Sequence, residues 1–337
     1  MLTLNSVRIH SLKMFRRWSV RIAAVALLPV ATSAQTTAVN DSTKINKEVG
    51  ICGGVFLKIV ELPEIAAKPS QGVFSIDESF ENFNLGQQIP VYYAIREWEA
   101  LIDSSGFNRS NFPITFRFGP LDPNGVLAVT VPTADGNGNL LSAEITFDND
   151  GSTNWFIDNS PEDDSEFLSG DLPQGVGLLS VTRHEIGHAL GWNTSERVTV
   201  HLSGNTFDQS LLNIATTTEG GLHTDPNVHV DDIMVPAIGT GVRRSISLYP
   251  SVAMMSQSFH YWISHLRCVA NTNNASQTGS VYQPWSRVQV GVMDTPARSL
   301  LIIGPGTYNE RVQSMRPAGD WLEIIAPRDA TAVIIGQ

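Results

Sequence analysis

Two histidines and a glutamate lie next to one another in the sequence, at His184, Glu185 and His188. On an α-helix, residues four positions apart share one face, so both imidazoles can bind a single metal ion. Imidazole pairs at this spacing are typical of zinc sites, in which the glutamate polarises a metal-bound water. The triplet therefore predicts a metal-dependent hydrolytic site carried by a helix.

The residues around this triplet predict an amphipathic helix. Those that recur at three- and four-residue spacing are Leu179, Thr182, Ile186, Ala189 and Leu190. This period predicts one buried face, with the histidines on another. Gly191 can end the helix in a left-handed conformation, which lets the chain turn back beneath the metal. The alternative is a surface helix with two solvated histidines.

The longer motif resembles the metzincin clan of zinc endopeptidases, whose pattern is H-E-x-x-H-x-x-G-x-x-H followed by a methionine-containing turn. His184, Glu185, His188 and Gly191 occupy the matching positions. The last position is Thr194, and a hydroxyl is a poor zinc ligand beside imidazole. The third ligand must therefore come from later in the chain, or the site is incomplete.

A segment further along resembles the methionine turn, at residues 232–236, with Met234 as the apolar floor beneath the histidines. Some metzincins carry an insertion before the third histidine, so the resemblance implies that His223 or His229 completes the site. His223 is favoured because its Thr-Asp-Pro neighbours predict a turn that could orient its ring. His201 is a more distant candidate, and each of the three could instead be an exposed loop residue.

The resemblance implies an enzyme in which zinc is bound by His184, His188 and the third histidine, with Glu185 as general base and a protein or peptide as substrate. A gluzincin-like site would take a glutamate from a later helix, but no acidic residue lies between Asp232 and Asp294. The alternative function is a catalytically silent zinc-containing surface protein, a hypothesis that the threonine at the third-ligand position keeps open.

The segments that must position these residues predict an α+β fold over residues 74–267. It combines a twisted sheet, the active-site helix, the methionine turn and a C-terminal helix. The predicted helices cover 90–102 and 243–259, and the predicted strands cover 114–118, 126–131 and 143–147. In metzincins an edge strand pairs with an extended substrate, and 126–131 and 143–147 are the candidates.

An acidic loop at 148–167 separates the predicted sheet from the helix. Its carboxylates could bind Ca²⁺, but the loop lacks the spacing and terminal glutamate of an EF-hand, and a solvated loop is the alternative. Arg243 and Arg244 could bind this loop or a substrate carboxylate, or they could be solvated.

The C-terminal part is predicted to differ from the rest of the chain. Residues 268–285 are polar and predict a linker. Residues 286–337 contain short apolar runs between turn residues and resemble one or two coils of a pectin-lyase-like right-handed parallel β-helix. Such coils need stacked neighbours. This segment is therefore expected to be a truncated β-helix or a cap, which in the silent-protein hypothesis binds carbohydrate or the cell surface.

The first 34 residues have the layout of a secretory signal peptide, with a basic lead, a short apolar run and cleavage after Ala34. An uncleaved anchor is the alternative, and residues 35–73 follow as an N-terminal segment. The leader contains 5 of the 22 basic residues and none of the 33 acidic ones. The chain after cleavage therefore has a formal net charge of 17 − 33 = −16. This charge argues against nucleic acid and anionic membranes as partners.

In a secreted protein Cys52 and Cys268 could form a disulfide or remain buried thiols.

Overall fold

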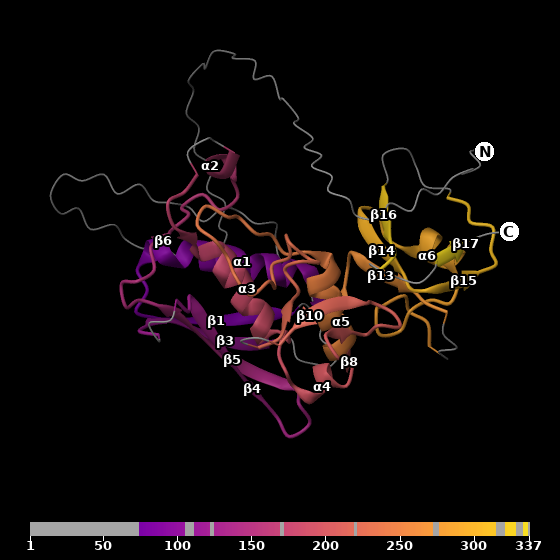
Figure 1. Ribbon diagram of the computed structural model, residues 1–337, viewed down its shortest axis with the longest axis horizontal. Helices are drawn as coiled ribbons and strands as arrows, with labels where there is room; N and C mark the ends of the chain where they lie inside the picture. The colour runs from indigo at the N-terminus through magenta and orange to yellow at the C-terminus, as the bar shows by residue number, and fades with distance from the viewer. Residues whose placement is uncertain are drawn as a thin grey trace, which may run out of the picture. The chain divides into compact units, whose positions relative to one another are not determined.

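The computed structural model describes residues 74–104, 111–121, 125–168, 172–218, 221–271, 276–314, 321–327 and 333–335 (Figure 1). All of them belong to one compact unit of the chain. The expected signal peptide, the N-terminal segment 35–73 and Cys52 lie outside these residues. Within the described ranges, no helix has both the length and the apolar character needed to cross a membrane.

A four-stranded mixed sheet forms the first half of the fold. Its strands, in spatial order, are β1 (Ser75–Glu81), β3 (Asn111–Gly119), β5 (Leu140–Asp148) and β4 (Ala128–Ala134). β1, β3 and β5 are parallel, whereas β4 runs antiparallel to β5. Alternate residues of β3 are buried, as expected for a strand with one covered face. Of the two candidate edge strands, β4 lies at the edge and β5 lies inside the sheet.

Two helices cover one face of this sheet, α1 (Leu85–Leu101) and α3 (Leu178–Ala189) (Figure 1). α1 begins upstream of its predicted start at Pro90, because Asn84 and Gln87 form a reciprocal capping box. Trp98 of α1 is fully buried, and its indole N–H donates to the carbonyl of Arg183, 3.0 Å away. The Arg183 side chain in turn pairs with Glu97. α1 therefore holds α3 in place.

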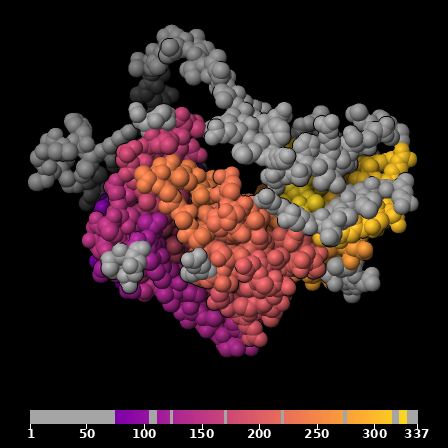
Figure 2. Space-filling view, viewed as in Figure 1, coloured from indigo at the N-terminus to yellow at the C-terminus, as the bar shows by residue number. Residues whose placement is uncertain are grey.

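The segment 196–224, which follows α3 and is called the insertion below, is built around a small antiparallel sheet. It contains α4 (Glu196–Thr199), β8 (Leu202–Ser203), β9 (Thr206–Phe207), β10 (Ile214–Thr217) and β11 (His223–Thr224), with sheet order β11-β10-β9-β8. Arg197 of α4 donates to Asn139 beside β5, 2.5 Å away. The surfaces of the first sheet (purple) and of the insertion (salmon) accordingly adjoin in Figure 2.

The predicted helix at 243–259 begins later than expected. The structure has η1 (Leu248–Val252) followed by α5 (Ala253–Phe259). The start at 243 is wrong because the Arg244 backbone N–H donates to Ser180 Oγ of α3, 3.0 Å away, and the Arg243 side chain is paired with the acidic loop. Residues 243–247 therefore join α3 to the acidic loop instead of extending the helix.

Three parallel strands organise the C-terminal part, β13 (Leu266–Val269), β14 (Ser299–Ile303) and β16 (Leu322–Ile325). The expected linker at 268–285 is wrong at its start, because Cys268 and Val269 belong to β13 and Val269 pairs with Trp285. Cys268 is a buried free thiol.

The remaining elements are β2 (Ile102–Ser104), β6 (Trp155–Phe156), α2 (Ser165–Leu168), β7 (Val176–Gly177), β12 (Trp262–Ile263), α6 (Val288–Asp294), β15 (Gly306–Tyr308) and β17 (Val333–Ile335).

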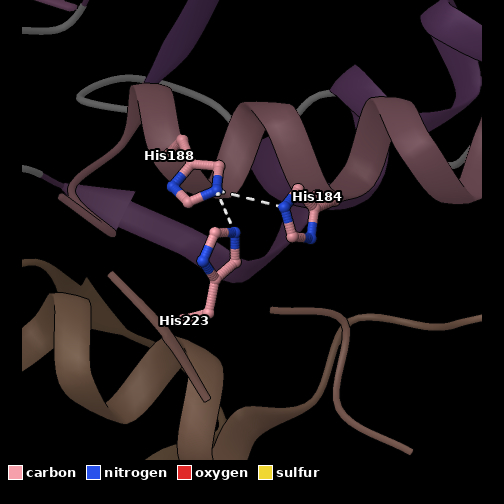
Figure 3. Close-up of side chains that lie close together, drawn as sticks. All are labelled: His184, His188 and His223. Atoms are coloured by element: carbon pink, nitrogen blue, oxygen red, sulfur yellow. Dashed lines mark hydrogen bonds between the residues drawn. The ribbon is translucent and has the colours of Figure 1, made fainter. Parts of the chain in front are cut away.

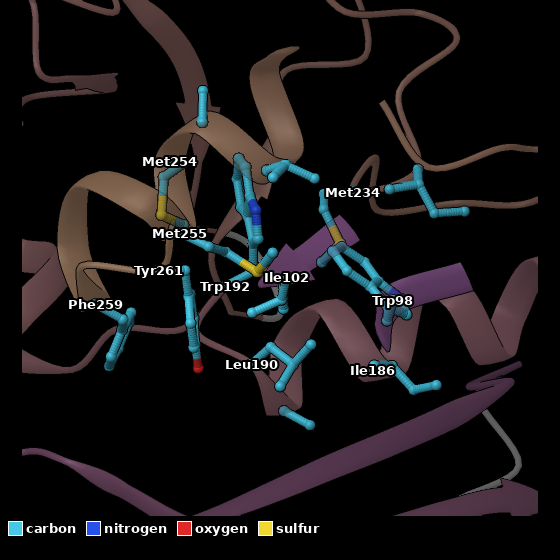
Figure 4. Close-up of a cluster of buried hydrophobic side chains, with 14 of the residues drawn as sticks. Trp98, Ile102, Ile186, Leu190, Trp192, Met234, Met254, Met255, Phe259 and Tyr261 are labelled. Atoms are coloured by element: carbon cyan, nitrogen blue, oxygen red, sulfur yellow. The ribbon is translucent and has the colours of Figure 1, made fainter. Parts of the chain in front are cut away.

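One hydrophobic core joins the elements around the site to this C-terminal part. It contains Trp98 of α1, Leu190 after α3 and Met254 of α5, and it also contains Leu300 and Ile302 of β14. Figure 4 shows Trp98, Leu190 and Met254 within one cluster of buried side chains. Because the core is continuous across residue 268, the C-terminal strands are not separated from the predicted catalytic domain by a linker.

Candidate metal centre

Three histidines converge in the described part of the chain, two from α3 and one from β11. His184, His188 and His223 form the only group of three or more potential metal-ligating side chains there, with ligand atoms within 4.8 Å of one another. The Nε2 atom of His188 lies 3.0 Å from Nε2 of His184 and 3.2 Å from Nε2 of His223 (Figure 3). The structure thus brings together the three histidines that the sequence analysis favoured.

The backbone fixes the tautomers of the two helical histidines. His184 Nδ1 lies 2.7 Å from the carbonyl oxygen of Ile233, and His188 Nδ1 contacts the carbonyl oxygen of Trp192. A carbonyl only accepts, so Nδ1 carries the proton in both rings and each Nε2 presents a lone pair. Two lone pairs 3.0 Å apart repel each other, and a cation between them removes that repulsion.

This donor set fits zinc. Tetrahedral zinc with Zn–N bonds of about 2.0–2.1 Å places its ligand atoms roughly 3.3 Å apart, close to the 3.0 and 3.2 Å that separate His188 Nε2 from the other two. Burial is the main cause that lowers the pKa of both His184 and His188 to about 4, and the neighbouring histidine adds to it. Both rings are therefore neutral at pH 7, which is the form that binds a metal.

Two glycines of this segment let other elements approach the back of the centre. A Cβ on Gly187 would lie 2.4 Å from Sδ of Met234, so the glycine makes room for the predicted methionine turn. Gly191 has a φ of +139°, and a Cβ there would lie 2.5 Å from the Phe259 ring. The helix thus ends just before a glycine with a positive φ, and Met234 is fully buried against the helix at Gly187 (Figure 4).

The other residues considered as ligands lie elsewhere. Thr194 is exposed. The His229 ring centroid is 6.1 Å from that of Tyr249, and the His201 ring is 5.4 Å from that of Phe207. None of these three belongs to the histidine group. His229, the alternative third ligand, is therefore separated from the centre despite its closeness to His223 in sequence.

Glu185 lies beside the histidines and is almost fully buried. Its carboxylate Oε2 accepts a hydrogen bond from Oγ1 of Thr130 on β4, at 2.6 Å. Burial is the main influence on the Glu185 carboxyl and raises its pKa, while His188 and Thr130 lower it. No spacing in the sequence marks Thr130 as a partner of Glu185, because the contact joins residues far apart in the chain.

Asp232 is a second residue that the sequence analysis did not assign to the site. Its carboxylate accepts hydrogen bonds from Thr224 Oγ1 at 3.0 Å, from the Met234 backbone N–H at 2.9 Å and from Ser251 Oγ at 2.5 Å. Burial raises the pKa of this carboxyl, and the three hydrogen bonds oppose that effect. Asp232 therefore ties β11, which carries His223, to the methionine turn and to η1.

Arg243 pairs with the acidic loop, which was one of the alternatives considered for it. It contacts Asp158 at 2.6 Å and Asp164 at 2.9 Å. Asp148 accepts hydrogen bonds from the backbone N–H groups of Leu121 and Asp150. These carboxylates serve internal contacts, and the described residues hold no second cluster of potential metal ligands. Ca²⁺ binding stays a prediction from the sequence.

Comparisons of this chain with protein-family models, with curated proteins and with solved structures give no match. The function of the centre is therefore inferred from its own residues and their geometry.

Proposed function

We propose that this protein is an exported, zinc-dependent endopeptidase of the metzincin type. The observation that carries the proposal is the convergence of three imidazole Nε2 atoms, two from α3 and one from β11, beside the buried Glu185 of α3. Three imidazoles with one further coordination position are typical of catalytic zinc, whereas structural zinc usually has four protein ligands.

His184, His188 and His223 would hold the metal, and His184 and His188 are oriented through their Nδ1 atoms. Zinc bound there would acidify a water and polarise the scissile carbonyl. Glu185 accepts the proton of the attacking water and passes it to the leaving amine. Because burial raises the pKa of Glu185, the carboxyl can accept and release a proton more readily near neutral pH. Met234 packs beneath α3 and is not expected to touch substrate.

A protein or peptide substrate is supported by the strand next to Glu185. β4 pairs with β5 on one side, and no described strand pairs with its other side. An extended peptide can add to such an edge through backbone hydrogen bonds. Val129 and Val131 are exposed on β4, while Thr130 between them faces Glu185. The edge and the general base are therefore adjacent.

The test is casein hydrolysis by the zinc-loaded wild-type protein and by Glu185→Gln, which keeps the shape of the side chain but removes the base. We expect Glu185→Gln to retain one zinc and to lose at least about a thousandfold in kcat. Glu144→Gln is the control, because Glu144 lies on β5 and pairs with Arg117. Zinc binding without hydrolysis by the wild type would instead favour the silent surface protein.

A further inference from the structure

Thr130 lies on the edge strand and faces the catalytic helix. Its hydroxyl oxygen is 2.6 Å from Oε2 of Glu185 and 3.1 Å from the backbone carbonyl oxygen of the same residue. Both of these groups are acceptors, and a threonine hydroxyl has one proton to donate. The shorter contact leads to the carboxylate, where a hydrogen bond is charge-assisted and strong. The proton of Thr130 is therefore directed to Oε2.

This hydrogen bond limits the freedom of a side chain that the sequence alone leaves flexible. The Glu185 carboxylate can rotate about its terminal bond, since such torsions are broad and roughly two-fold. The hydrogen bond from Thr130 to Oε2 restricts this rotation and leaves Oε1 to accept a proton. Glu185 is 5% exposed, so bulk water does not replace the hydroxyl as a partner.

We propose that Thr130 is a positioning residue for the general base: it holds Oε2 of Glu185 so that Oε1 is aimed at the attacking water. This inference rests on the peptidase function proposed above. Thr130 pairs through its backbone with Ile145 of β5, so its place in the sheet is set by the strand register. The strand that would pair with an extended substrate thus also orients the base.

The test compares Thr130→Val, which replaces the hydroxyl by a methyl group of similar size, with Thr130→Ser, which keeps the hydroxyl. The substrate is a synthetic peptide that contains a casein bond cut by the wild type. We expect Thr130→Val to lower kcat about 10- to 100-fold with KM changed less than about twofold and zinc content unchanged. Thr130→Ser should stay within about threefold of the wild-type kcat.

Thr115→Val is the matched control. Thr115 lies on β3 of the same sheet, where its hydroxyl accepts a hydrogen bond from Ser79. The Thr115→Val variant tests whether the loss of any threonine hydroxyl from this sheet slows the reaction. We expect its kcat to equal that of the wild type. A wild-type kcat for Thr130→Val, a change in KM alone, or a loss that Thr130→Ser does not rescue would overturn the positioning role.

Crystal structures of the zinc-loaded wild type and Thr130→Val separate this proposal from the peptidase proposal. We expect one Glu185 conformer in the wild type, and a rotated or split carboxylate in the valine variant. This result would show that Thr130 orients the Glu185 carboxylate even if the wild type cut no casein, in which case the peptidase proposal alone would fail. An identical Glu185 conformer in both structures would overturn the role of Thr130.

Discussion

Burial determines the protonation state of the histidines in the candidate metal centre. His184 is buried and His188 is half-buried, both have Nδ1 on a backbone carbonyl, and burial lowers the pKa of both to about 4. In an unfolded chain a histidine has a pKa of about 6.5. Between these values the unfolded protein binds more protons than the folded protein.

The metal-free protein should consequently lose stability as the pH falls from about 6.5 to about 4. Stability rises with pH wherever the unfolded state binds more protons, so the contribution is complete above about pH 6.5 and is lost progressively as the pH falls to about 4. By pH 5 the loss for each histidine is on the order of 2 kcal/mol. Urea denaturation in EDTA at pH 7 and pH 5 measures it.

His184→Gln is the comparison, because it removes one of the two titrating groups. It should show a smaller difference in unfolding free energy between pH 7 and pH 5 than the wild type. An equal difference in the two proteins would mean that other groups cause the acid sensitivity.

At the scale of elements, the position of His223, the proposed third ligand, depends on contacts between segments that are distant from α3 in sequence. His223 lies on β11 at the end of the insertion, and the backbone N–H of the next residue, Thr224, donates to the carbonyl of Met234 at 2.9 Å. Asp232 adds bonds to Thr224, Met234 and Ser251. The position of His223 is thus set by the methionine turn and η1.

Asp232→Ala should therefore weaken zinc binding although Asp232 is not a ligand. The substitution leaves three buried donors without their acceptor, so we expect about 3 kcal/mol less free energy of unfolding and a 10- to 100-fold loss in zinc affinity. Asp232→Asn should retain most of the stability and most of the zinc affinity. Its Oδ1 can accept two of the hydrogen bonds, and its amide N–H can donate to Ser251. Chemical denaturation and competitive zinc titration measure these quantities. Equal damage from alanine and asparagine would show that the charge matters and not the bonds.

The sequence predicted these elements unevenly, for physical reasons. The apolar period of 179–190 and the strand-forming run at 114–118 are local signals, and α3 and β3 lie where they indicate. The start of the C-terminal helix was wrong because the Arg244 backbone bonds to Ser180, which is distant in sequence. The roles of Thr130 and Asp232 were not predicted for the same reason, since neither residue has a sequence spacing that marks its partner.

At the scale of the whole molecule, the C-terminal strands and the insertion share one core. Leu211 and Leu212 of the insertion belong to the same cluster as Leu300 and Ile302 of β14. A Cβ on Gly304 would lie 2.9 Å from Leu211, which shows how closely the end of β14 approaches the insertion. The polar composition of 268–285 predicted a boundary, but composition does not reveal that Val281 and Trp285 are buried.

A substitution in β14 should accordingly destabilise the part that contains the three-histidine group. Ile302 is fully buried, so Ile302→Ala should lower the free energy of unfolding by about 2–5 kcal/mol. We expect one cooperative transition in which tryptophan fluorescence and zinc release coincide. Ile324→Ala is the control and should cost less, because Ile324 is 36% exposed. Two separate transitions, with the zinc-binding transition unchanged by Ile302→Ala, would make the C-terminal part an independent module.

The zinc content of the purified protein tests the central claim most directly, measured for the wild type, for His223→Ala and for His229→Ala. His229 is the matched control because it lies close to His223 in sequence but outside the histidine group. We predict one zinc per chain in the wild type and in His229→Ala, and at least about a hundredfold weaker binding in His223→Ala. Full zinc content in His223→Ala, or its loss in His229→Ala, would contradict the three-histidine centre.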